Sequence, residues 1–99
     1  SKGYGRIVRG STAIAVGDAD GSKVQATFDM NNAASGNRGQ SYVGSILDSP
    51  NTTSATTYKL QIRHENGAGN ANINRLHVND DSSVNGRYSS TITLMEVSV

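Results

Sequence analysis

The 99-residue chain contains no cysteine and no tryptophan, and it has one proline and one phenylalanine. Without cysteine, neither disulfides nor a cysteine-ligated zinc ion can hold the fold together. The sequence has no apolar run near the length of a membrane span and no charged-then-apolar signal segment. We therefore expect one domain over residues 1–99, without insertion into a membrane.

The chain also lacks an excess of charge of one sign. Nine basic and eight acidic residues are scattered singly, and the formal net charge is +1. Duplex nucleic acid requires a concentrated basic face, so a nucleic-acid partner is not expected. The first residue is Ser1 rather than methionine. This start predicts a processed or excised piece of a longer protein.

Large apolar side chains are scarce. Val, Ile, Leu and Phe supply 19 residues, whereas Gly, Ser, Thr and Asn supply 42. Ordering the chain costs conformational entropy that apolar burial must offset. Two interpretations follow: a marginal, turn-rich β domain, or a β subunit that completes its core against copies of itself. We favour the second.

The sequence does contain short alternating segments bounded by Gly, Asn, Asp and Ser, which indicate strands and turns. In residues 23–30, Val24, Ala26, Phe28 and Met30 fall on one face. In residues 57–64, the inward positions are Tyr58, Leu60, Ile62 and His64, and Lys59, Gln61 and Arg63 point outward. The expected strands are 3–9 (with Ile7 inward), 11–17, 23–30, 41–49, 57–64, 71–78 and 88–99. About seven such strands predict an all-β, antiparallel β-sandwich of jelly-roll type.

The closing stretch "SSTITLMEV" is apolar on both faces. Ile92 and Leu94 share one side of the expected strand, and the next apolar residues alternate to the other. A single small sandwich has no third layer to cover the second side, so a neighbouring subunit would cover it. The alternative is a bulge near Leu94 that turns both sets toward one core. The trimer-interface candidates are Ile92, Leu94, Met95, Val97 and Val99.

No pattern selects a catalytic residue, a metal ligand set or a cofactor. Asp18, Asp20 and Gly21 resemble the start of a calcium loop, but the following residues are typical of a strand, so a plain turn is favoured. The two histidines, His64 and His77, lack a visible third ligand and are interpreted as core or interface residues. Neither a nucleophile elbow nor a phosphate-binding glycine loop is present. We expect no enzyme activity.

Polar loops and tyrosines are the better candidates for binding. Loops 31–40, 65–70 and 79–87 are rich in residues that form adaptable hydrogen bonds. Tyrosine offers an apolar face with a polar tip, which suits contact with a sugar or a protein. For each of Tyr4, Tyr42 and Tyr88, however, burial in the core is the favoured interpretation. The receptor-contact candidates are Tyr42, Asp80, Asp81, Asn85, Arg87 and Tyr88.

The segment "LDSPNTTSATTYKLQIRHENGAGNANINR", followed later by "STITLMEV", resembles the C-terminal domains of bacteriophage structural and tail-fibre proteins. The match covers residues 47–75 and 90–97, and "GSTAIAVGDADGSKVQATF" fits the same pattern more loosely. The resemblance implies a homotrimeric jelly roll of the C1q and tumour-necrosis-factor type. The C-terminal strand would then lie near the three-fold axis. Complete domains of this type usually carry further N-terminal strands, so the short chain is interpreted as a C-terminal domain from a longer protein.

The same resemblance implies a non-enzymatic virion protein at a fibre tip, on the virion surface and outside the cell. Its expected partners are two copies of itself, the rest of the fibre or virion protein, and a host surface glycan or protein. The alternative is a trimerisation cap or capsid decoration domain that binds no receptor. A sugar-cleaving module is a third hypothesis, for which the sequence offers no carboxylate pair or aromatic platform.

Overall fold

A computed structural model describes residues 2–31, 41–64, 72–75, 80–83 and 85–98. Within these residues the regular secondary structure is one antiparallel sheet, with no helix. Its strands are β1 (Lys2–Arg9), β2 (Thr12–Ile14), β3 (Phe28–Asn31) and β4 (Tyr58–His64). A helix long and apolar enough to cross a membrane is therefore not found in the described part of the chain. The all-β, antiparallel prediction is confirmed.

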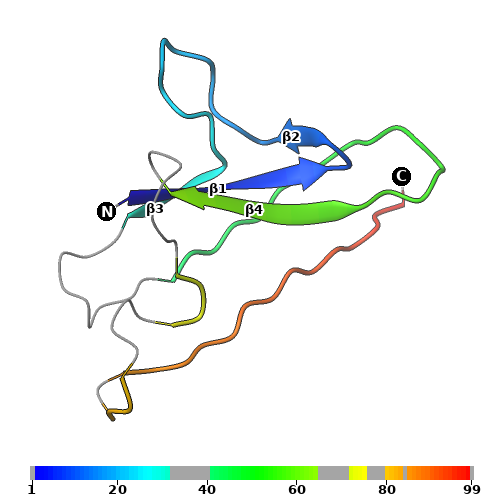
Figure 1. Ribbon diagram of the computed structural model, residues 1–99. Coiled ribbons are helices and arrows are strands. Elements are labelled where there is room, and N and C mark those ends of the chain that lie inside the picture. The colour runs from blue at the N-terminus through cyan, green and yellow to red at the C-terminus, as the bar shows by residue number, and fades with distance from the viewer. Residues whose placement is uncertain (1, 32–40, 65–71, 76–79, 84, 99) are drawn as a thin grey trace.

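Strand β1 is central to this sheet (Figure 1). Along one edge it pairs with β4 over seven positions, from Gly3 opposite His64 to Arg9 opposite Tyr58. Its other edge is shared, because β3 pairs with the first half of β1 and β2 with the second half. Gly10 opens the two-residue turn from β1 to β2 with a φ of 59°, and Arg9 pairs with Thr12 across it. Positive φ at the first turn position suits glycine and the right-handed twist of a hairpin.

Thr27 joins the two short strands that share the edge of β1. Its main-chain N–H donates to the Gly5 carbonyl at 2.8 Å. Its hydroxyl accepts a hydrogen bond from the Ile7 N–H at 3.0 Å and donates to the Ile14 carbonyl at 3.3 Å. Thr27 thus bridges the gap between β2 and β3 along the edge of β1. It provides hydrogen-bond partners for main-chain groups of β1 and β2 that are not paired by a strand at this point.

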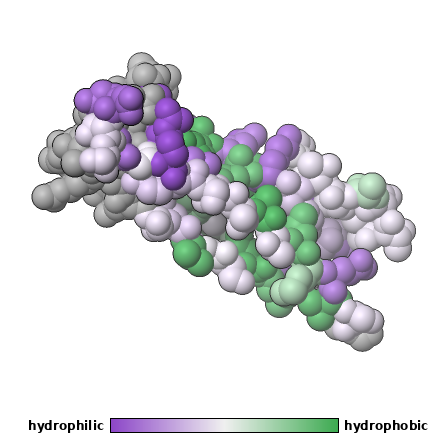
Figure 2. Space-filling model, turned by 90° about the horizontal axis from the view of Figure 1, so that it is seen from below, coloured by the Kyte–Doolittle hydropathy of each residue, from purple (hydrophilic) through white to green (hydrophobic). Residues whose placement is uncertain are grey.

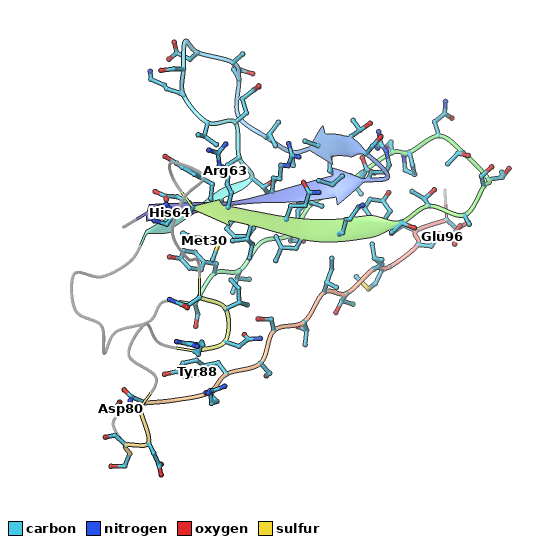
Figure 3. The ribbon with its side chains drawn as sticks, viewed as in Figure 1. Met30, Arg63, His64, Asp80, Tyr88 and Glu96 are labelled. Atoms are coloured by element: carbon cyan, nitrogen blue, oxygen red, sulfur yellow. The ribbon has the colours of Figure 1, made fainter. Side chains whose placement is uncertain are left out.

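Successive side chains alternate between the two faces of the sheet, of which one is mainly apolar and the other is mainly polar apart from the buried Val8. The register places Phe28 and Met30 of β3 and Ile7 of β1 on the same side as Leu60 and Ile62 of β4, and we call this side the apolar face. The opposite side, the polar face, carries four cross-strand neighbours. They are Tyr4, opposite Arg63, and Arg6, opposite Gln61. Figure 3 shows Arg63 and Met30 on opposite sides of the sheet.

The predicted inward positions of 57–64 share this face with Ile7, Phe28 and Met30, as expected. The face is not a closed core, because Leu60 is 43% exposed, and the fully buried Val8 lies on the opposite side of the sheet, across from Lys59. Gly5 is buried there directly under the Phe28 ring, which occupies the space that a Cβ at residue 5 would need. The Phe28 ring also stacks with the Tyr42 ring, at a centroid distance of 6.0 Å. Glycine at position 5 therefore allows the aromatic pair to lie flat on β1.

Other predicted strands are shorter than expected or wrong. The expected strand 11–17 is limited to Thr12–Ile14, because Ala15 adopts a φ of 51° and turns the chain away. The expected strand 23–30 pairs only from Phe28. The predictions of strands at 41–49 and at 88–99 are wrong over residues 41–49 and 88–98, which are not strands. Both segments have alternating sequences, but a strand also requires a neighbouring ladder, and neither segment has one among the described residues.

Half of the expected strand 71–78 falls outside the described part, as do residues 32–40 and 65–70 of the polar loops and residues His77, Val84 and Val99. In the described stretch 72–75, Arg75 forms an isolated antiparallel bridge with Arg87.

Candidate functional site

Residues 41–48, which we call the bridging segment, cross the apolar face of the sheet. At one end Tyr42 stacks on Phe28. At the other end Asp48 binds Arg9 and Tyr58, which face each other on β1 and β4. Between these anchors the cover is thin, since Val43 is 98% exposed and Leu47 is 88% exposed. The segment therefore places apolar side chains in solvent as well as over the sheet.

The Arg9, Asp48 and Tyr58 side chains form a partly buried polar cluster. Arg9 Nη1 donates to both carboxylate oxygens of Asp48, at 2.6 and 2.7 Å, and the Tyr58 hydroxyl donates to Asp48 Oδ2 at 2.6 Å. The Tyr58 hydrogen bond, followed by the Arg9 contact, lowers the pKa of Asp48. The same carboxylate raises the pKa of Tyr58 and of Arg9 through its hydrogen bonds to them. Charge-assisted bonds of this kind fix the bridging segment in register against the sheet.

Sequence reasoning missed this cluster. Asp48 lies 39 positions from Arg9 and 10 from Tyr58, and only Tyr58 was assigned to the inward face. A lone acidic residue two positions before the proline carries no signal of its partner, so the sequence pattern does not predict this pairing.

Residues 88–98, which we call the C-terminal segment, run alongside the sheet without joining it (Figure 1). Their apolar side chains are unprotected: Met95 is 84% exposed and Val97 is 70% exposed, and Ile92 and Leu94 are also more than half exposed. The bulge alternative required both sets of side chains to turn into one core of the same chain. The described members of both sets, Ile92 and Leu94 on one side and Met95 and Val97 on the other, are exposed. Val99 lies outside the described residues.

Exposed apolar residues gather on one side of the molecule. Figure 2, which views the protein from below, shows hydrophobic atoms over the middle and one end of this side, interspersed with atoms of intermediate hydropathy; we call this the exposed apolar band. The large apolar side chains that the structure leaves exposed are concentrated in the bridging and C-terminal segments. By contrast, Val8, with 2% exposure, is the single fully buried large apolar side chain among the described residues. Clustered exposed apolar side chains of this kind make this side of the molecule a candidate interaction surface.

The turn that precedes the C-terminal segment contains four of the six receptor-contact candidates, and a fifth, Tyr88, is the first residue of that segment. Asn85 Nδ2 donates to the main-chain carbonyl of Asp80 at 2.9 Å and also to its carboxylate. The Tyr88 ring folds back over Gly86, and the Tyr88 N–H donates to the Asn74 carbonyl at 2.8 Å. Figure 3 shows Asp80 and Tyr88 at the end of the C-terminal segment that lies away from β4. Residues Asp80, Asp81, Ser82, Asn85, Gly86 and Arg87 line a hollow of about 300 Å³.

The structure brings Asp80, Asp81, Asn85, Arg87 and Tyr88 together, and it places Tyr42 elsewhere, against Phe28. Burial raises the pKa of Tyr42, and the nearby Asp29 carboxylate adds to this effect. Tyr42 is thus partly covered, but it is still 39% exposed and Tyr88 is 56% exposed, so neither is a buried core tyrosine.

The "DADG" stretch is a turn, as favoured. Gly21 has a φ of 57°, the Lys23 N–H donates to the Asp20 carbonyl at 3.1 Å, and the two side chains form an ion pair. His64 lies half-buried on the apolar face opposite Gly3. A group of three side chains able to hold a metal ion is not found among the described residues.

A scan against protein-family models, a search of curated proteins and a search of solved structures each found no match. The fold and site define a small all-β domain with an open antiparallel sheet and an exposed apolar band. Its function is therefore argued from these residues.

Proposed function

We propose that this chain is the C-terminal domain of a bacteriophage fibre or virion protein, which trimerises into a jelly-roll assembly and contacts the host surface. In this proposal it is not an enzyme, and it acts outside the cell on the virion surface. Three copies would present the same weak site on one axis, and they would gain avidity from simultaneous engagement.

The observation that carries the proposal is the exposed C-terminal segment. It is extended and apolar on two sides, and in the described chain it lacks a ladder partner. Extended main chain with unpaired N–H and C=O groups is a template for pairing with another chain. Pairing with a second copy would satisfy those groups and cover Met95 and Val97 in the same step.

The dimensions of the molecule support an incomplete unit. Its radius of gyration is 15.9 Å and its extents are 49 × 34 × 17 Å. A compact domain of this length has a radius of gyration of about 13 Å. The thinnest dimension accommodates little more than one sheet and one covering layer, since stacked sheets lie about 10 Å apart. A sandwich with a full core would require further layers from sister chains.

The mass of the purified protein in solution tests the assembly. Light scattering coupled to size exclusion should give about three chains. The double variant Met95→Lys/Val97→Lys should give one chain, because two buried lysines would face an apolar neighbour. Thr53→Lys, an exposed change in the loop before β4, is the matched control and should remain trimeric. A wild-type monomer at high concentration would overturn the proposal.

Host contact is tested at the turn of residues 80–88. The double variant Asp81→Ala/Arg87→Ala should retain the oligomer and weaken adsorption of the parent particle to its host. Unchanged adsorption would remove this turn from the contact surface. Two further results together would favour the structural cap over the receptor-binding domain. Deletion of the domain would abolish fibre assembly, and the isolated trimer would not bind host cells.

A further inference from the structure

A groove of about 540 Å³ lies on the polar face of the sheet, on the side opposite the exposed apolar band. One wall consists of the four cross-strand neighbours of β1 and β4, and Figure 3 shows Arg63 projecting on this side. The other wall is the chain excursion between β2 and β3, residues 22–26. Gln25 stabilises that excursion by donating from Nε2 to the Gly17 carbonyl at 2.8 Å.

The lining of the groove is cationic. Among the described lining residues it contains Arg6, Lys23 and Arg63 and no acidic side chain. The nearby carboxylates of the described residues belong to Asp20, which is ion-paired with Lys23, and to Asp29, which lies opposite Tyr4 in the ladder. Asp20 offsets the charge of Lys23, so Arg6 and Arg63 are the other cationic groups of the described lining.

Arg6 is held in place for binding. Its Nε donates to Oε1 of Gln61, its cross-strand neighbour on β4, at 2.8 Å, which holds the guanidinium across the ladder. Arg63 lies two residues beyond Gln61 on the same side of β4, and its Nε donates to the His64 carbonyl at 3.2 Å. A guanidinium presents its donors in a planar fork that matches a carboxylate.

We propose that this groove binds an acidic saccharide, with Arg6 and Arg63 on a sugar carboxylate. Uncharged hydrogen-bonding groups, Ser22, Gln25 and Gln61, line the same groove and suit sugar hydroxyls. Tyr4 adds an aromatic ring of the type that packs against a sugar.

The charge of the whole chain favours a saccharide over a nucleic acid or an anionic membrane. With a net charge of +1, the protein lacks the broad basic surface that those polyanions require. The groove combines a local pair of cations with many uncharged polar groups, which matches a ligand with few charges and many hydroxyls.

This inference goes beyond the proposed host contact at residues 80–88, because the groove lies on another face and is complete within one chain. A monomeric protein would overturn the trimer proposal and leave the groove intact. Conversely, a trimer whose groove binds nothing would overturn this inference alone.

The test measures binding of a short alginate oligosaccharide, a chain of carboxylate-bearing sugars, to the full 99-residue chain by calorimetry or chemical-shift perturbation. The double variant Arg6→Gln/Arg63→Gln should weaken binding about tenfold or more, the effect expected for lost charge-assisted hydrogen bonds. Arg6→Lys keeps the charge without the fork, and it should give an intermediate loss. Lys59→Gln is the matched control, because Lys59 lies on the same side of β4, opposite Val8, and does not line the groove.

Circular dichroism of each variant checks that the fold is retained. Binding of alginate that depends on both arginines and not on Lys59 supports the inference. An equal loss in Lys59→Gln would show non-specific attraction and overturn it. Equal binding of a neutral oligosaccharide, or stronger binding of a sulfated oligosaccharide or of polyglutamate, would each overturn the assignment to a sugar carboxylate.

Discussion

At the scale of single residues, Gly5 and Phe28 determine how closely the apolar face can be covered. Gly5 is buried, and the space beside its Cα is occupied by the Phe28 ring. The ring cannot simply swing away, since Tyr42 stacks against it at 6.0 Å. The three residues thus form one packed unit that ties β1, β3 and the bridging segment together.

Gly5→Ala should therefore destabilise the protein by about 1–3 kcal/mol, the usual cost of overpacking a filled site. Urea denaturation measures the change. Gly17→Ala is the matched control, because a Cβ at residue 17 meets no atom within 4 Å. In the background Phe28→Leu, the Gly5→Ala change should cost less than in the wild type. Equal costs in both backgrounds would show that the ring is not the obstacle.

Asp48 gives a second residue-scale prediction, on pH dependence. Hydrogen bonds from Tyr58 and Arg9 lower its pKa in the folded protein. A carboxylate with a depressed pKa stabilises the fold above the ordinary aspartate pKa of about 3.9, and that contribution is lost as the pH falls through the lower, folded value. Asp48→Asn should therefore lower the Tm by a few degrees at neutral pH. The difference from the wild type should shrink below about pH 4.

Thermal denaturation over a pH series measures this difference. Tyr58→Phe removes the hydrogen bond that lowers the pKa of Asp48 most, and it leaves the Arg9 contact in place. It should therefore reduce the pH-dependent part of the stability, but by less than Asp48→Asn does. If the difference in Tm between the wild type and Asp48→Asn did not change with pH, the assigned charge interaction would be contradicted.

At the scale of elements, the edge of β1 depends on one side chain. The Thr27 hydroxyl accepts from the Ile7 N–H and donates to the Ile14 carbonyl between β2 and β3. Thr27→Val keeps the shape and removes the hydroxyl, so the Ile7 N–H loses its partner. We expect a loss of about 1–3 kcal/mol in the free energy of unfolding. Amide exchange at Ile7 should also accelerate, whereas Thr27→Ser should retain both properties. Unchanged exchange in Thr27→Val would show that water replaces the hydroxyl.

The elements also show what the sequence could and could not predict. Strands β1 and β4 and their inward residues were predictable, because period-two patterning reports directly on a ladder with one apolar side. The bridging and C-terminal segments have equally good patterns, yet they are not strands in the single chain. Patterning identifies segments that are able to pair, and it carries no information on whether a partner lies within reach.

The two candidate sites also differ in how far the sequence predicts them. The neighbours at residues 80–88 are close in sequence and were predicted together, and the structure brings them together. The arginines of the groove belong to strands that are far apart in sequence, so their proximity depends on the register of β1 against β4. The outward assignment of Gln61 and Arg63 was the one signal of the groove, and it did not identify Arg6 across the ladder.

At the scale of the whole molecule, stability and assembly should be one equilibrium. The described residues bury one large apolar side chain fully and form the exposed apolar band. Copies that bind the folded state and not the unfolded one stabilise it by mass action, so the Tm of the wild type should rise with protein concentration. For Met95→Lys/Val97→Lys the Tm should be lower and independent of concentration, because the lysines prevent that burial. Scanning calorimetry of dilute and concentrated samples measures both. If the wild-type Tm were independent of concentration, the single chain would supply its own stability, and the exposed band would have no role in folding.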